Sequence, residues 1–265
     1  MLSVLKVGGS VLRDDASYSA TARFLKGRLD GCADETLVVI VSAEYGATDD
    51  LLAQAEAITD GPAAQALDLL WSTGELRSVA RLALHLQRIG VVAIPFNVHQ
   101  TGLVADRVSG TTVRPLRLLA ALAASRIVIV PGFLGVSAGG TITSLGRGGS
   151  DLTAVLLATA VRADRCELIK DVPGYFTADP HHDTHARQIH DLPIEEALRM
   201  ADAGCDLVQR AALAAAAHAG LHLVIRSMDA AAPVTHVHAS ISRQDRSTQY
   251  GVRHQDDSRR AAVRA

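Results

Sequence analysis

Aromatic and cysteine residues are scarce in this sequence. Aromatic side chains make up 3% of its 265 residues, and tryptophan occurs once. A core must therefore be built mainly from Ala, Val, Leu and Ile, and a hydrophobic content of 48% is ample for one large α/β domain. The three cysteines, Cys32, Cys166 and Cys205, are too few and too scattered for a disulfide framework. This usage is typical of a reducing compartment, and we expect a cytoplasmic protein.

The sequence also lacks an excess of charge of one sign and lacks long apolar runs. Lys and Arg number 26 against 28 Asp and Glu, which gives no electrostatic reason to expect nucleic acid or a membrane surface as a partner. No apolar run reaches the roughly 18–20 residues that span a bilayer. The start, Met1–Ser10, has no basic segment followed by an apolar one, so it does not resemble a signal peptide. We therefore expect neither a nucleic-acid nor a membrane partner.

Short β-branched runs alternate with longer stretches of helical periodicity. Strands are predicted at Leu2–Val7, Leu37–Ser42, Val91–Pro95, Arg126–Val130, Cys166–Lys170 and Leu223–Arg226. Helices are predicted at Ser17–Leu29, Asp49–Ile58, Glu75–Gln87, Pro115–Ala124, Asp151–Ala163, Ile194–Ala203 and Leu207–Ala219. This alternation is typical of a mostly parallel sheet with helices on both faces. We predict an α/β fold, a three-layer α/β/α sandwich with a mostly parallel central sheet.

No Pro-, Gly- or Ser-rich linker divides the sequence into separate domains. We predict one domain over residues 1–242, in which a rise in glycine density separates an N-terminal half of about 1–145 from a C-terminal half of about 146–242. Residues 243–265 contain six Arg and three Asp, a formal charge of +3, and little apolar content. We expect this basic tail to be flexible.

Two glycines and a lysine mark the end of the first predicted strand, in Lys6-Val7-Gly8-Gly9-Ser10. Glycine lets the backbone approach a phosphate closely, and the start of the following helix presents free N–H groups to an anion. The lysine adds a point charge that can follow a phosphoryl group during transfer. The same pattern also occurs in ordinary strand–turn–helix connections, so by itself it indicates phosphate binding only weakly.

Two further loops rich in glycine or proline follow predicted strands. In the first, Thr143–Asp151, Arg147 offers a planar fork suited to a carboxylate or phosphate, and Ser150 and Asp151 can cap the next helix. The second is Lys170–Pro180. Ligands of open α/β sheets bind beyond the carboxyl ends of the strands. The three loops are therefore expected to converge on one ligand site at that edge.

Five blocks of this sequence resemble the catalytic domain of the aspartokinases, in the amino-acid-kinase superfamily, in the same order and with compatible spacing. They are Lys6-Val7-Gly8-Gly9, Ser42-Ala43-x-x-Gly46-x-Thr48-Asp49-x-Leu51, Ser72-x-Gly74-Glu75-x-x-Ser78, Gly146 to Asp151, and Asp171-Val172-Pro173-Gly174-x-x-Thr177-Ala178-Asp179-Pro180. The likeness runs from about residue 2 to residue 228. It implies the amino-acid-kinase fold, ATP and Mg²⁺ as cofactors, a small anionic substrate and a homodimer.

The resemblance also implies a role for each matched position. Lys6 and Asp151 are implied as catalytic, with Lys6 on the transferred phosphoryl group and Asp151 ordering that lysine. The implied substrate contacts are Thr48, Glu75, Arg147 and Ser150, with Arg147 on the α-carboxylate and Glu75 on the α-ammonium. The implied nucleotide contacts are Gly8, Gly9, Ser10, Lys170, Asp171, Tyr175, Asp179 and Pro180. No side chain is assigned as a metal ligand.

The sequence departs from the aspartokinase pattern at two positively charged positions. His181 stands where aspartokinases usually have an arginine, and Asp206 stands where they have a lysine. Both changes remove positive charge from the implied nucleotide segment, and Lys170 and Arg210 are candidates to replace it. About forty residues follow Ser227, too few for the pair of small regulatory domains of aspartokinases. We therefore expect feedback inhibition by lysine or threonine to be absent.

Three functions remain open from the sequence. The leading one is a kinase that converts the carboxylate of aspartate or a close analogue to an acyl phosphate. The second is a kinase of the same superfamily that phosphorylates a phosphate, phosphonate or carbamate group. The third is a degenerate homologue kept for binding or regulation. Glu75 separates the first two, because an acidic side chain favours an ammonium and disfavours a dianion.

Overall fold

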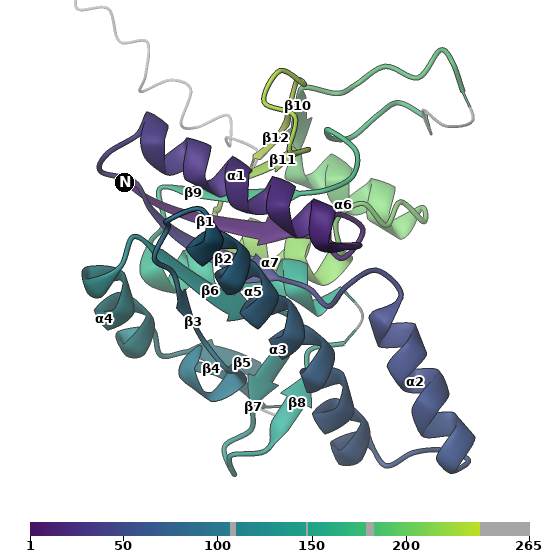
Figure 1. Cartoon of the computed structure of the whole chain (residues 1–265). Coiled ribbons are helices and arrows are strands. Elements are labelled where there is room, and N and C mark those ends of the chain that lie inside the picture. The colour runs from purple at the N-terminus through teal and green to yellow at the C-terminus, as the bar shows by residue number, and fades with distance from the viewer. Residues whose placement is uncertain (107–109, 147, 179–182, 239–265) are drawn as a thin grey trace, which may run out of the picture.

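An eight-stranded sheet forms the centre of the computed structural model, which describes residues 1–106, 110–146, 148–178 and 183–238 (Figure 1). The strand order is β10-β12-β11-β9-β1-β2-β6-β3. The strands are β1 (Leu2–Val7), β2 (Thr36–Val41), β3 (Ile94–Pro95), β6 (Ile127–Pro131), β9 (Arg165–Ile169), β10 (Asp191–Pro193), β11 (Leu223–Arg226) and β12 (Thr235–His238). Neighbouring strands are parallel except β11 and β12, which are antiparallel. The mostly parallel sheet is confirmed.

Helices cover both faces of this sheet. On one face lie α1 (Asp15–Gly31) and α3 (Ala64–Arg88), in front of the sheet in Figure 1. On the other lie α4 (Leu116–Ala124), α5 (Gly149–Val161), α6 (Ile194–Asp202) and α7 (Arg210–Ala219). The remaining helix, α2 (Ala47–Ile58), packs beside α3 and projects from the body of the molecule. The predicted three-layer α/β/α sandwich is therefore confirmed.

The central strands β1, β2 and β6 are buried on both sides, which is why their sequences are nearly continuous runs of apolar residues. Side chains alternate between the faces of a strand. Val4 therefore contributes to the core beneath α5 and α7, whereas Leu5 contributes to the core beneath α1 and α3. Full burial of such a side chain stabilises the fold by roughly 1.5–3 kcal/mol. These strands form the rigid base from which the loops at their carboxyl ends project.

A separate four-stranded sheet, in the order β5-β4-β7-β8, was not predicted. Its strands are β4 (Leu103–Asp106), β5 (Gly110–Val113), β7 (Leu134–Val136) and β8 (Ile142–Ser144). Each has only three or four residues, too few to show a period-two pattern.

Within the described residues, no helix combines the length and the apolarity needed to cross a bilayer.

The largest difference from the predicted boundaries is the start of α3, which begins at Ala64 rather than Glu75. Gly74 lies inside this helix and is buried. A Cβ atom at Gly74 would lie 3.3 Å from the Cβ of Ala43 and 3.2 Å from a methyl group of Leu51. The glycine therefore permits close packing of α3 against the loop after β2, and it does not end the helix.

Candidate active site

The loops after β1, β2 and β9 meet at the carboxyl edge of the sheet. The Gly8 N–H donates to the carbonyl oxygen of Ile169, with 3.1 Å between the heavy atoms, and so joins the first loop to the end of β9. A Cβ atom at Gly9 would lie 2.8 Å from the carbonyl oxygen of Ala43. This is closer than a side chain tolerates, so the approach of the first two loops requires glycine there. Of the three loops predicted to converge, Lys6–Ser10 and Lys170–Pro180 meet at this edge, and the loop after β2, which was not among the three, joins them.

A buried carboxylate between two lysines lies behind these loops. Asp151, in the first turn of α5, is 2% exposed. Its Oδ1 lies 2.8 Å from Lys6 Nζ, and its Oδ2 accepts a hydrogen bond of 2.8 Å from Lys170 Nζ. Lys6 belongs to β1, and Lys170 directly follows β9. Three elements far apart in sequence thus bring two ammonium groups onto one carboxylate.

The surroundings of this cluster shift the pKa values of Asp151 and Lys170. Burial alone would raise the pKa of Asp151, but the ammonium groups of Lys6 and Lys170 outweigh it and hold that pKa well below its usual range. Burial lowers the pKa of Lys170 to about 8, and Lys6 lowers it as well, while Asp151 acts in the opposite direction. The carboxylate is therefore ionised at neutral pH, and Lys170 carries its charge only below a pH of about 8.

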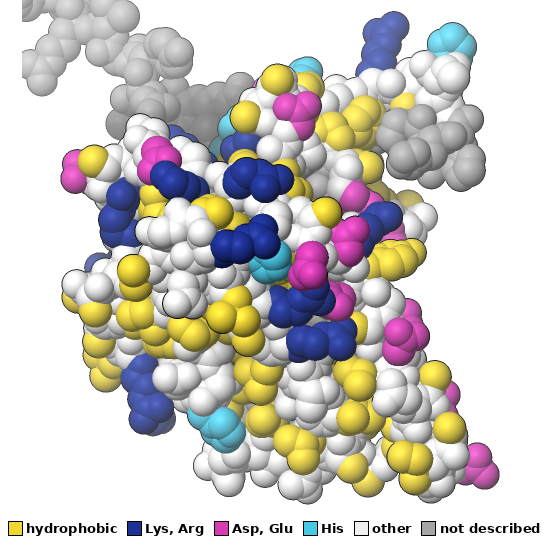
Figure 2. Space-filling model, in the orientation of Figure 1, with side chains coloured by type: hydrophobic (Ala, Val, Ile, Leu, Met, Phe, Trp, Pro, Cys, Tyr) yellow, Lys and Arg dark blue, Asp and Glu magenta, His cyan; other side chains and the backbone are white. Residues whose placement is uncertain are grey.

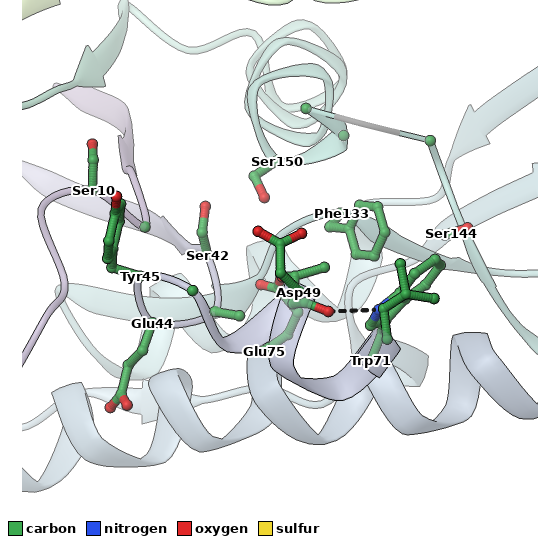
Figure 3. Close-up of a pocket in the computed structure, with 18 of the residues that line it drawn as sticks. Ser10, Ser42, Glu44, Tyr45, Asp49, Trp71, Glu75, Phe133, Ser144 and Ser150 are labelled. Atoms are coloured by element: carbon green, nitrogen blue, oxygen red, sulfur yellow. Dashed lines mark hydrogen bonds between the residues drawn. The ribbon is translucent and has the colours of Figure 1, made fainter. Parts of the chain in front are cut away.

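A cavity of about 540 Å³ opens on the Lys6 side of the cluster. Figure 3 shows Ser42, Asp49 and Ser150 directed into it, whereas Glu44 points away. The indole N–H of Trp71 donates to the carbonyl oxygen of Thr48 at 3.2 Å along one wall. The lining residues are Lys6, Gly9, Ser10, Ser42, Ala43, Glu44, Tyr45, Gly46, Thr48, Asp49, Leu52, Trp71, Glu75, Phe133, Ser144, Gly146, Gly148, Gly149 and Ser150.

Glu75 supplies a buried carboxyl group to this first cavity. It lies on α3 and is 3% exposed. The backbone N–H groups of Ala43 and Gly132 bond to it, yet its Oε2 has no hydrogen-bond partner among the described residues. Burial raises the pKa of Glu75 to about 8, although the two N–H groups and Lys6 act in the opposite direction. An unpartnered buried carboxyl oxygen of this kind is suited to a ligand cation such as an ammonium.

A second cavity, of about 610 Å³, opens on the Lys170 side of the cluster. Among the described residues that line it, the charged ones are Lys170, Asp171 and Asp206. Ser10 lines both cavities, so the loop after β1 separates them. The other lining residues are Val172, Gly174, Tyr175, Phe176, Thr177, Ala178, Met200, Gly204, Cys205 and Leu207.

Ion pairs hold the outer wall of the first cavity against α1 and α3. Glu44, in the loop after β2, pairs with Arg81 and, at 2.8 Å, with Arg77, both on α3. Arg81 also pairs with Asp15 of α1 at 2.6 Å. Figure 2 shows basic side chains gathered beside acidic ones on this face of the molecule. The direction of Glu44 in Figure 3 follows from these contacts, and the loop is fixed from outside the cavity.

The structure divides the predicted site residues between the two cavities. Lys6, Gly9, Ser10, Thr48, Glu75 and Ser150 line the first, and Ser10, Lys170, Asp171 and Tyr175 line the second. Gly8 lies beside them in the loop after β1, and Asp151 lies between the cavities. The predicted contacts Arg147, Asp179 and Pro180, and also His181, fall outside the described residues, as does the tail 243–265. The roles assigned to all these residues remain predictions.

Several lining residues were not singled out from the sequence. Tyr175, by contrast, was predicted as a nucleotide contact. It is only 1% exposed, and its hydroxyl has no partner among the described residues, so its side chain belongs mainly to the core. Phe133 was not assigned to the site from the sequence. It follows a Pro-Gly pair, lines the first cavity and has a φ of +65°. A left-handed conformation is costly for an aromatic residue and is often found at functional sites. Ser42, Asp49, Trp71 and Ser144 are also new to the site, and of these only Ser42 and Asp49 belong to a matched block.

The model of the amino acid kinase family matches residues 1–227. This chain belongs to the amino acid kinase family. Aspartokinase 2 of Bacillus subtilis (strain 168) is 37% identical over 212 residues, which cover 78% of this chain and 51% of that protein. The crystal structure of aspartate kinase from Synechocystis superposes with a TM-score of 0.81 at 36% identity, covering 90% of this chain and 40% of that one.

A further member of the amino acid kinase family has been solved with ligands. Escherichia coli aspartokinase III in complex with aspartate and ADP superposes with a TM-score of 0.76 at 26% identity, covering 92% of this chain and 66% of that one. This chain spans about half the length of the curated relatives that it matches. The comparisons therefore show the family and the fold, and the activity of this chain is a matter for proposal.

Proposed function

We propose that this chain is an ATP-dependent kinase that phosphorylates the side-chain carboxylate of aspartate or a close analogue. The observation that carries the proposal is the Lys6–Asp151–Lys170 cluster, because its two ammonium groups belong to the linings of two different cavities. A kinase must bring two anionic groups together and offset their repulsion. A pair of cations between two cavities meets that requirement.

The first cavity is proposed as the acceptor site and the second as the nucleotide site. This assignment divides the proposed single domain 1–242 into a substrate half of about 1–145 and a nucleotide half of about 146–242, with some lining residues crossing that division. Each cavity lies within the 300–1,000 Å³ typical of small-molecule sites. Support comes from the likeness to aspartokinases along most of the chain. We also propose a homodimer in the cytoplasm, and sedimentation of the purified chain would test the oligomeric state.

The chemistry requires positioning and charge more than proton transfer. A carboxylate oxygen of the acceptor forms a bond to the γ-phosphorus while the bond from that phosphorus to the bridging oxygen of ADP breaks. The carboxylate is already ionised, so no general base is needed. Lys6 stabilises the charge on the phosphoryl oxygens from the acceptor side, and Lys170 does so from the nucleotide side. Asp151 holds both ammonium groups in place and is a positioning residue.

The residues present also fit Mg²⁺. This ion prefers oxygen ligands and is usually held by one or two carboxylates together with the phosphates of the substrate. Asp171 offers a carboxylate, and the neighbouring Ser10 offers a hydroxyl, which donates to Asp171 Oδ1 at 3.1 Å. When bound there, Mg²⁺ would neutralise charge on the nucleotide phosphates.

A second candidate function is favoured by one observation on Glu75. Its pKa of about 8 makes this carboxyl neutral at pH 7 in the unliganded protein, so it does not repel a phosphate or phosphonate acceptor as an ionised carboxylate would.

The test that separates the two functions is a hydroxylamine trap for acyl phosphate, with purified protein, ATP and Mg²⁺. Hydroxamate formed with aspartate or an analogue supports the first function. ATP-dependent phosphorylation of a phosphate, phosphonate or carbamate without hydroxamate supports the second. Absence of ATP consumption across the panel would refute both.

A further inference from the structure

Arg13 lies where the three loops of the site come together. It follows the Lys6–Ser10 segment and precedes α1. Its Nε donates to the carbonyl oxygen of Ser10 at 2.7 Å, its guanidinium lies 5.0 Å from the centre of the Tyr45 ring, and its Nη2 lies 4.0 Å from Asp171 Oδ2. These partners belong to the loops after β1, β2 and β9. Arg13 itself lines neither cavity, but its guanidinium is held beside Tyr45 of the first, Asp171 of the second and Ser10, which lines both.

Most of the hydrogen-bonding capacity of Arg13 is unused. A guanidinium has five N–H donors, and within the described part of the chain one of them makes a hydrogen bond. The neighbouring carboxylates are otherwise engaged, because Asp14 caps α1 and Asp15 pairs with Arg81. The contact with Asp171 joins two side chains that are each about half exposed, and such pairs contribute about 0–1 kcal/mol. Little free energy opposes a new anionic partner.

The second cavity needs such a cation if it binds a polyphosphate. Asp171 and Asp206 outnumber Lys170 among its described charged residues, and Lys170 already bonds to Asp151. The N–H groups of Gly9 and Ser10 have no backbone or side-chain acceptor among the described residues, so the loop that carries Arg13 also offers donors to an anion. Arg13 offers a planar fork that matches a phosphate, and its Nη atoms make no hydrogen bond within the described part of the chain.

We propose that Arg13 is a phosphate-binding residue, whose guanidinium leaves Asp171 and contacts the outer phosphates of the nucleotide where the two cavities meet. This inference rests on the proposed nucleotide site in the second cavity. Tyr45 supports the guanidinium from the acceptor side, since a cation over an aromatic ring gains roughly 0.5–1 kcal/mol at an exposed site. The alternative is a purely structural latch that ties the three loops together.

The number of phosphates on the ligand separates the two roles. Isothermal titration calorimetry would measure adenosine, ADP and ATP, with Mg²⁺, against the full chain and against Arg13→Gln. We expect the substitution to weaken ATP and ADP binding by about tenfold, equivalent to about 1.4 kcal/mol, and to change adenosine binding by less than about twofold. Arg13→Lys should give an intermediate loss, because it keeps the charge without the fork.

Two controls keep the result interpretable. Arg23→Gln removes the same charge from an exposed position on α1 and should leave all three affinities unchanged. Melting curves of each variant would show that the fold is intact. An equal loss for adenosine and ATP would show a structural latch, and unchanged ATP affinity in Arg13→Gln would show no role, so either result would overturn the inference while the proposed function stands. If the wild-type chain bound no adenine ligand, the proposed function itself would fail, and the inference with it.

Discussion

The two cavities contain buried ionisable groups of opposite charge that are shifted to the same pH. In the first, burial raises the pKa of Glu75 to about 8. In the second, burial lowers the pKa of Lys170 to about 8, with a further contribution from Lys6. Below this pH Glu75 is neutral and Lys170 is charged, and above it the reverse holds. One physical cause, the loss of solvation, therefore acts in opposite directions on the two sides of Asp151.

The comparison indicates how the unliganded site is prepared for its ligands. At pH 7 the second cavity already has one charged cation, Lys170, that can contribute to phosphate binding. The first cavity has a neutral acid, which acquires its charge only when a ligand cation compensates for the desolvation. An ammonium-bearing acceptor would thus ionise Glu75 as it binds, whereas a nucleotide would stabilise a charge that Lys170 already has. Four substitutions test this asymmetry and the cluster between the cavities.

The largest effect is expected for Asp151→Asn. The substitution leaves two buried ammonium groups without their carboxylate, and removing one partner of a buried ion pair costs about 3–5 kcal/mol. Urea unfolding at pH 7 should show a loss of this size, together with loss of kinase activity. Asp49→Asn, at an exposed position of the first cavity, should change the free energy of unfolding by less than about 0.5 kcal/mol. A similarly small change for Asp151→Asn would mean that the cluster is not electrostatically coupled.

The next effect is expected for Lys6→Ala. Removing one group that stabilises transition-state charge typically lowers turnover by about 10²–10³-fold, and we expect at least this loss of kcat. Because Lys6 lines the first cavity and not the second, the affinity for ADP should change little. Steady-state kinetics and calorimetry would measure the two quantities. Lys26→Ala, in an exposed ion pair with Asp30 on α1, should leave both unchanged. Unaltered turnover in Lys6→Ala would show that the role of Lys6 is misassigned.

Much of this arrangement could be predicted from sequence, because the central strands and the matched blocks carry strong local signals. β1 and β11 have the predicted limits, since both are short segments rich in Val, Leu or Ile, with Gly8 after the first and His222 and Ser227 on either side of the second. Lys6, Glu75 and Ser150 were expected in one site and do line one cavity. These residues lie on a strand or helix, or next to one, whose position follows from the sheet.

Features that depend on packing between distant segments could not be predicted. Gly74 lies inside a helix because a residue without a side chain is needed next to Leu51 and Ala43. Helix propensity, which depends on the local sequence alone, does not include such packing. The sharing of Asp151 by Lys6 and Lys170 depends on the neighbouring positions of β1 and β9 in the sheet. The four-stranded sheet could not be predicted either, because strands as short as Leu134–Val136 show no recognisable pattern in the sequence. Tertiary context decides each of these cases.

A smaller effect is expected from the titration of Lys170. As pH rises through about 8, Lys170 loses its proton and the second cavity loses a cation. The affinity for ADP should therefore fall above this pH, by up to about tenfold per pH unit. Because a bound phosphate favours the charged lysine, this fall begins at about pH 8 and ends at the higher pKa that Lys170 has in the complex. Lys170→Arg keeps its charge throughout and should remove this dependence in calorimetry between pH 6.5 and 9.5. An identical pH dependence in that variant would assign the titration to another group.

The smallest effect concerns proton release by Glu75. Its folded-state pKa of about 8 lies above the unfolded value of 4.5, so the unliganded folded protein holds an extra proton between these limits, and this group makes the fold less stable as pH rises from 4.5 to 8. An ammonium ligand reverses the shift. Binding at pH 7 should then release up to about one proton, seen in calorimetry as a dependence of the observed heat on the ionisation enthalpy of the buffer.

The variant Glu75→Gln should bind such a ligand more weakly and release none of this proton. A phosphate or phosphonate acceptor would release no proton from Glu75, because it favours the neutral acid. Proton release by wild type but not by Glu75→Gln would therefore place a ligand cation at Glu75, and absence of release with aspartate would show that the carboxyl is not the ammonium contact.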